Sequence, residues 1–193
     1  RVIADAAAMA IPDAICFVSE RGRALDGFEA LYARGLELGW TFYAVTDSVY
    51  DKLKDTRTPQ GLAAMLPFFA YTFDSLPAIA PEKAVLYLRS IQDPGNLGAI
   101  LRTADALQIP AVLLDGCADP YNPKTVRASM GAVFRTQPVR MTRQQAIAAC
   151  RDAGIPLLAT AMSADAVDLR QAELPSAAVI IGSEGQGICQ ELF

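Results

Sequence analysis

Residues 93–104 read DPGNLGAILRTA, a turn that leads into a helix. The proline and the first glycine favour the turn, and Asn96 is placed to cap the helix by accepting a hydrogen bond from a free backbone N–H. Apolar residues then recur at helical spacing over residues 97–107. Just upstream, residues 84–88 (AVLYL) form the short apolar run of a buried strand. The stretch therefore predicts a strand, a turn and a helix in succession.

The same alternation continues along the rest of the chain. Apolar runs predict further strands over residues 111–114, 155–159 and 178–181. Residues 124–130 and 142–153 predict helices, the second followed by a glycine that suits a helix C-terminus. Short strands that alternate with helices form parallel sheets with helices on both faces. The expected fold class is α/β with a parallel sheet.

A smaller α/β domain is expected upstream of this sheet. Residues 1–73 mix both patterns, with a helix predicted over residues 28–38 and a strand over residues 41–45. Residues 74–82 contain two prolines and little periodicity, which favours a linker. The second domain then spans residues 83–193.

Composition excludes several functional classes. The 193 residues carry a net charge of −4, so the whole molecule is not the basic body of a charge-driven nucleic-acid binder. There is no histidine, which removes the commonest general base and the commonest metal ligand. The four cysteines form no CxxC pair, so we expect free thiols, no metal site and a cytoplasmic protein. No apolar run is long enough to predict a membrane span.

Ligands of open α/β sheets bind beyond the carboxyl ends of the strands, where three segments of this chain are expected. The first holds Asn96 and, six residues later, Arg102. Arg102 falls about 140° around the helix from Leu97, off the apolar stripe, so it projects outward. The pair is a candidate site, although a helix cap and a solvated arginine would leave the same pattern.

The second segment, residues 122–131 (NPKTVRASMG), combines a helix start with basic side chains. Free N–H groups at a helix N-terminus bind anions, and Lys124 and Arg127 would strengthen a contact with phosphate. A capped surface helix with two solvated cations is the alternative.

The third segment, residues 181–187 (IGSEGQG), places three glycines directly after a buried strand. Glycine lets the backbone approach a ligand closely. The segment is neither GxGxxG nor a phosphate-binding loop with lysine, so it indicates no dinucleotide or triphosphate site. A plain glycine-rich turn remains the alternative.

Taken together, the three segments resemble the three motifs of the SpoU (TrmH) family of SPOUT-class RNA 2′-O-ribose methyltransferases. The matching stretches are residues 93–104, residues 124–134 (KTVRASMGAVF) and residues 179–188 (VIIGSEGQGI). The resemblance covers residues 84–193. Upstream, residues 53–63 (LKDTRTPQGLA) resemble the end of the family's L30e-like substrate-binding domain. The stretch before it, residues 46–52, is short for such a domain.

The resemblance implies a trefoil-knotted domain that binds S-adenosylmethionine and acts as a homodimer without metal. The methyl group would pass to a ribose 2′-hydroxyl of structured RNA, with rRNA favoured over tRNA because of the L30e-like domain. Asn96, Arg102 and Glu184 match the catalytic positions. A guanidinium holds its proton too tightly to be a good base, so Arg102 is expected to position groups and stabilise charge.

The resemblance also implies binding residues. Those expected at the cofactor are Thr160, Ala161, Gly182, Ser183 and Gly185. Those expected in a basic, RNA-binding patch are Lys124, Arg127, Ser129 and Arg135. In the family the third motif continues into a strand and a Ser-Leu-Asn-x-Ser segment that completes the knot. This sequence stops at Phe193, before that segment, so the knot is expected to be incomplete here.

Two other functions are compatible with parts of the sequence. A non-catalytic RNA-binding protein could retain the SPOUT fold without binding the cofactor, and the early end at Phe193 favours it. Asn96, Arg102 and Glu184 favour the enzyme instead. A different α/β nucleotide-binding domain would need a phosphate loop that the sequence lacks.

Overall fold

The computed structural model describes residues 1–53, 58–69, 84–136, 138–161, 166–171, 176–183 and 187–188. The chain divides into two compact units, Arg1–Phe69 and Ala70–Phe193. The predicted linker, residues 74–82, lies outside the described residues. No helix in the described part is long and apolar enough to cross a membrane.

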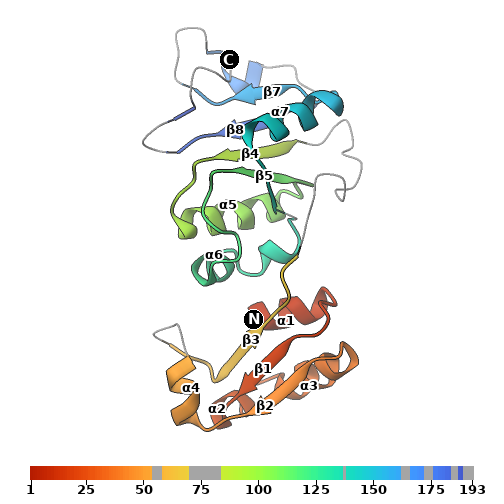
Figure 1. The fold of residues 1–193 in the computed structure, drawn as a ribbon, viewed down its shortest axis with the longest axis vertical. Coiled ribbons are helices and arrows are strands. Elements are labelled where there is room, and N and C mark those ends of the chain that lie inside the picture. Colours follow the sequence, from red (N-terminus) through yellow and green to blue (C-terminus); the bar gives the residue numbers. More distant parts are fainter. Residues whose placement is uncertain are drawn as a thin grey trace. The chain divides into compact units, whose positions relative to one another are not determined.

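The first unit is a three-stranded sheet with short helices (Figure 1). Its elements are α1 (Val2–Ala8), β1 (Ile15–Val18), α2 (Glu20–Arg23), α3 (Phe28–Glu37), β2 (Thr41–Ala44), α4 (Asp47–Leu53) and β3 (Leu62–Met65). The strand order is β2-β1-β3, with β1 parallel to β2 and antiparallel to β3. The helix and strand predicted over residues 28–38 and 41–45 are confirmed as α3 and β2. Helices α1, α2 and α4 and strands β1 and β3 were not predicted.

Trp40 anchors the core of this unit. Its side chain is buried, and its indole N–H donates a hydrogen bond of 2.7 Å to the carbonyl of Ile11. Its ring lies beside that of Phe42 on β2, and Phe42 also meets Tyr32 of α3 edge to face. Aromatic contacts of this kind hold α3 against β2.

The second unit is built on a five-stranded parallel sheet (Figure 1). Its elements are β4 (Val85–Arg89), α5 (Pro94–Ala106), β5 (Val112–Asp115), α6 (Pro123–Ala128), the 3-10 helix η2 (Ala132–Phe134), β6 (Pro138–Arg140), α7 (Arg143–Asp152), β7 (Leu157–Ala159), the 3-10 helix η3 (Leu169–Gln171) and β8 (Ala178–Ile181). The order is β6-β5-β4-β8-β7, and neighbouring strands run parallel throughout this sheet. The α/β prediction is confirmed. Strand β6, three residues that begin with a proline, was not predicted.

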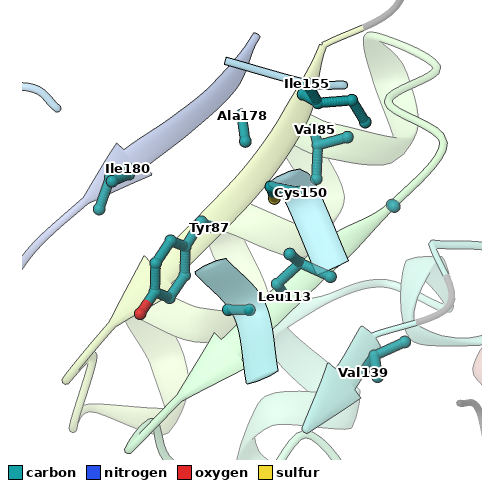
Figure 2. Packing of buried hydrophobic residues seen from close by; sticks show 10 residues of the cluster. Val85, Tyr87, Leu113, Val139, Cys150, Ile155, Ala178 and Ile180 are labelled. Carbon is teal, nitrogen blue, oxygen red and sulfur yellow. The ribbon is translucent and has the colours of Figure 1, made fainter. Parts of the chain in front are cut away.

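The sheet lies in the interior of the second unit, because its strands carry buried apolar residues on both faces. Figure 2 shows Val85 and Tyr87 of β4 packed with Leu113, Cys150 and Ile180, so β4, β5, β8 and α7 share one core. Tyr87 is fully buried, and its hydroxyl donates a hydrogen bond of 2.9 Å to Oδ2 of Asp115. Burial, and then this carboxylate, raise the pKa of Tyr87, so the phenol stays neutral.

Helices α5 and α6 approach closely because one residue of α5 has no side chain. A Cβ on Gly98 would lie 2.6 Å from the Ala128 Cβ, 2.6 Å from the Thr125 carbonyl oxygen and 2.9 Å from the Ser129 nitrogen. Leu97, on the same helix, is buried. Gly98 therefore sets the distance between the helices that carry the first two sequence motifs.

Candidate functional site

The candidate site is a pocket at the carboxyl edge of the second unit's sheet. The chain leaves β4 for β5 on one side, whereas β8 joins β4 from the other side. Loops diverge at such a point and leave a crevice, where open α/β sheets bind ligands. The pocket there has a volume of about 460 Å³. It is lined by Ile91, Gln92, Asp93, Asn96, Ala99, Ile100, Ile181, Gly182 and Ser183.

The pocket brings together three of the predicted site residues. Asn96 comes from α5, whereas Gly182 and Ser183 follow β8, almost ninety positions later in the chain. Arg102, Thr160 and Ala161 do not line it. Glu184 and Gly185 lie outside the described residues.

The start of α5 differs from the prediction. The helix begins at Pro94, and its N-cap is Asp93, whose Oδ1 accepts a hydrogen bond of 2.9 Å from the Asn96 backbone nitrogen. The prediction that Asn96 caps this helix is therefore wrong. Proline is favoured at the first helical position and a carboxylate just before it, so the Asp-Pro pair was the signal that the sequence offered. As a result, Asn96 lies in the first turn of the helix, where it lines the pocket.

Arg102 is exposed on the same helix. Six residues separate it from Asn96, which is about 9 Å along a helix axis. Among the residues that the structure describes, none forms an ion pair or side-chain hydrogen bond with Arg102. Its guanidinium is thus available to a ligand that approaches this side of α5.

Helix α6 carries the second motif. It spans Pro123–Ala128, and Asn122 caps it by accepting a hydrogen bond of 2.9 Å from the Lys124 nitrogen. Ser129, just after it, is fully buried. Its hydroxyl donates to the Val126 carbonyl at 2.8 Å, which favours a structural role over the predicted contact with RNA.

Lys124 and Arg135, both predicted to bind RNA, form ion pairs with acidic side chains. Lys124 Nζ lies 2.7 Å from Oδ2 of Asp93. Arg135 forms a forked ion pair with Asp105, with Nη2 2.7 Å from Oδ2. Arg127 is exposed on α6. The cations of this motif are therefore partly neutralised within the protein.

Hydrogen bonds hold the residues that follow β7 and β8. Thr160 donates from its hydroxyl to the Ile180 carbonyl at 2.8 Å, and Ala161 follows it. After β8, the Gly187 nitrogen donates a hydrogen bond of 2.9 Å to the Ser183 carbonyl. A Cβ on Gly182 would collide with the Gly187 carbonyl group. Only glycine allows this close approach.

Gln92, which also lines the pocket, was not predicted from the sequence. Its amide nitrogen donates to the Gly116 carbonyl at 2.6 Å and so joins the loops that follow β4 and β5. No local sequence pattern predicts a hydrogen bond between residues 24 positions apart. Within the described ranges, no group of three or more potential metal ligands occurs.

Fold and pocket define the class: an α/β protein whose ligand site lies between diverging loops at the carboxyl edge of a parallel sheet. The chain belongs to the SpoU rRNA Methylase family, whose sequence model matches residues 83–193.

Relatives of known name agree with this assignment. The 23S rRNA (guanosine(2553)-2′-O)-methyltransferase RlmP of Bacillus subtilis is 33% identical over 156 residues, which are 79% of this chain and 60% of that protein. The chain thus spans less than two thirds of this relative's length. An AdoMet-bound rRNA methyltransferase from Sinorhizobium meliloti has a TM-score of 0.83 at 27% identity, over 99% of this chain and 71% of that one. The SpoU methyltransferase AviRb from Streptomyces viridochromogenes, in complex with AdoMet, has a TM-score of 0.79 at 26% identity, over 99% and 73%.

Proposed function

We propose that this chain belongs to an S-adenosylmethionine-dependent RNA 2′-O-ribose methyltransferase, with rRNA as the preferred substrate. The observation that carries the proposal is the pocket that unites Asn96 with the glycine segment after β8. The AdoMet-bound relatives support the cofactor, and the name of the Bacillus relative supports ribose methylation of rRNA.

The residues at the carboxyl edge suit the cofactor. The pocket volume falls in the range of small-molecule sites, and its wall is apolar apart from a few polar groups such as Asn96 and Ser183. Gly182 leaves room for close backbone approach. The residues proposed to hold the cofactor are Thr160, Ala161, Gly182, Ser183 and Gly185. When bound, S-adenosylmethionine supplies the methyl group.

The chain's own residues then have to align the ribose and stabilise its oxygen. Methyl transfer depends on an aligned nucleophile more than on a strong acid. Asn96 orients the ribose 2′-hydroxyl from the pocket wall. The Arg102 guanidinium stabilises negative charge on that oxygen as its proton passes to a neighbouring phosphate oxygen of the RNA. Glu184, in the third motif, completes the proposed catalytic set.

The proposal extends to the family's architecture. Residues 83–193 form the SPOUT domain, whose trefoil knot is completed by chain beyond the third motif, and residues 1–73 form an L30e-like domain that binds RNA. The protein acts as a cytoplasmic homodimer, without metal. The proposed phosphate contacts are Arg102, Arg127 and Arg135, the last of which also pairs with Asp105.

The test is methylation in vitro by the full-length protein. In vitro transcribed 23S rRNA and tRNA are incubated with S-adenosylmethionine carrying a labelled methyl group, and the nucleosides are identified by mass spectrometry. We expect label on a ribose 2′-oxygen of the rRNA. Base methylation would overturn the proposed chemistry. RNA binding without any transfer, under conditions that saturate the protein with cofactor, would favour a non-catalytic RNA-binding protein.

The glycine segment gives a prediction for cofactor binding. Gly182→Val should lower the affinity for S-adenosylmethionine by roughly tenfold or more, since the added side chain displaces the Gly187 carbonyl and opens the segment. Isothermal calorimetry measures the affinity.

A matched control is Gly154→Ala, in the turn after α7. There an added Cβ has no neighbour within 4 Å, but the backbone φ is +66°, which alanine adopts only under strain. Gly154→Ala should cost some stability through this strain and leave cofactor affinity unchanged. Equal affinities in the wild type and Gly182→Val would remove Gly182 from the proposed cofactor site.

A further inference from the structure

The two helices that carry the first and second motifs are joined at their first turns by one carboxylate. Asp93 caps α5 with Oδ1, which accepts the 2.9 Å hydrogen bond from the Asn96 nitrogen. Its other oxygen, Oδ2, lies 2.7 Å from Nζ of Lys124 on α6. Asn122 in turn caps α6 through the backbone nitrogen of Lys124. One side chain thus connects a pocket residue of α5 to the start of α6.

The contact between Asp93 and Lys124 packs closely against the backbone of α5 at Gly95. A Cβ on Gly95 would lie 2.7 Å from Asp93 Oδ1 and 3.4 Å from Lys124 Cε. The lysine stem therefore runs over the first turn of α5, and a side chain at position 95 would press against the Asp93 carboxylate. Gly98, one turn further along α5, allows the two helices to approach closely because it has no side chain.

Stability alone does not explain this arrangement. The side chains of Lys124 and Asp93 are 57% and 47% exposed, and ion pairs this exposed contribute little to folding. Lys124, and then the Asn96 backbone hydrogen bond, hold the pKa of Asp93 below its usual range, so the carboxylate is charged at neutral pH. The contact fixes the orientation of the Asp93 carboxylate, because both of its oxygens accept hydrogen bonds. Asp93 also lines the pocket.

We propose that Asp93 and Lys124 are positioning residues for methyl transfer: Lys124 holds the Asp93 carboxylate, which holds the first turn of α5 so that Asn96 faces the pocket. The inference rests on the proposed function and deepens it. It gives Lys124 a role inside the protein, whereas the family pattern suggested a direct contact with RNA phosphate.

A double-mutant cycle separates the two roles. Asp93→Asn keeps a good capping oxygen but loses the charge that attracts Lys124, and Lys124→Met removes the ammonium while keeping much of the stem. The two single variants and the double variant of the full-length protein are assayed for single-turnover methyl transfer to a 23S rRNA transcript. RNA affinity is measured across a range of salt concentrations.

If Lys124 acts through Asp93, each single variant loses roughly tenfold in rate and the double variant loses no more than either, because both changes break one contact. RNA affinity and its salt dependence stay as in the wild type, and Lys124→Arg restores most of the rate. The proposal is overturned if Lys124→Met weakens RNA binding and lowers the log–log salt slope by about one unit, equally in the wild-type and Asp93→Asn backgrounds.

A measurement without RNA keeps this inference distinct from the proposed activity. Amide hydrogen exchange at the Asn96 nitrogen reports directly on the hydrogen bond to Asp93. Lys124→Met should speed this exchange roughly tenfold. Asp105→Asn, which weakens the ion pair between α5 and Arg135, should leave it unchanged. Unaltered exchange in Lys124→Met would refute the positioning role, whether or not the protein methylates RNA.

Discussion

Replacing Arg102 by alanine is expected to lower the single-turnover rate of methyl transfer by about 10²- to 10³-fold, with S-adenosylmethionine affinity within a few-fold of the wild type. Arg102 is exposed, has no ion-pair partner in the described part of the chain, and lies outside the pocket lining. Its loss therefore removes a charge offered to the substrate and breaks no ion pair among the described residues. Rapid-quench assays and calorimetry measure the two quantities.

A matched variant tests whether any exposed arginine would do the same. Arg151 lies in the last turn of α7, is exposed, and like Arg102 has no described ion-pair partner. Arg151→Ala should leave the rate within about twofold and the melting temperature unchanged. Arg102→Lys should recover only part of the rate, because an ammonium lacks the planar fork of a guanidinium. A collapsed melting temperature in Arg102→Ala would instead make this residue structural.

The elements that the sequence predicted best are those whose pattern is local. Strands β4, β5 and β8 are apolar runs, and α5 shows buried residues at helical spacing, so each was placed to within a few residues. From these elements the parallel sheet followed, and with it the edge at which the pocket lies.

What escaped prediction depends on partners that are distant along the chain. Nothing near Lys124 in the sequence shows that its ammonium meets Asp93, 31 residues away, or that Arg135 meets Asp105. The sequence therefore predicts an RNA contact for a basic residue such as Lys124, whose acidic partner only the fold reveals. Burial of the Ser129 hydroxyl is likewise set by the turn that follows α6, which hydrophobic periodicity does not resolve.

The start of α5 shows a different limit of prediction from sequence. Both Asp93 and Asn96 are good capping residues, and the apolar stripe of α5 begins only at Leu97, so periodicity favoured Asn96. Pro94, between them, favours Asp93 as the cap, since proline fits the first helical position and has no N–H to satisfy. The difference matters for function, because a capping Asn96 would have its side chain occupied by the backbone.

Gly98→Ala is expected to destabilise the second unit by about 1–3 kcal/mol, although alanine in place of a helical glycine ordinarily stabilises. The added methyl would stand 2.6 Å from the Thr125 carbonyl oxygen and 2.9 Å from the Ser129 nitrogen. Two of its three nearest neighbours are thus backbone atoms of α6 and its end, which no rotamer change moves away. Helix α6 has to shift as a body. Urea denaturation measures the change in the free energy of unfolding.

Two further variants show whether close helix packing is the cause. Thr103→Ala, on the exposed side of α5, should change the free energy of unfolding by less than about 0.5 kcal/mol. Adding Ala128→Gly to Gly98→Ala removes one colliding group, the Ala128 Cβ, so it should recover part of the loss, while the backbone contacts keep the recovery incomplete. A Gly98→Ala variant as stable as the wild type would mean that α5 and α6 separate at little cost. The first turns joined by Asp93 and Lys124 would then be held by that ion pair more than by the packing of the two helices.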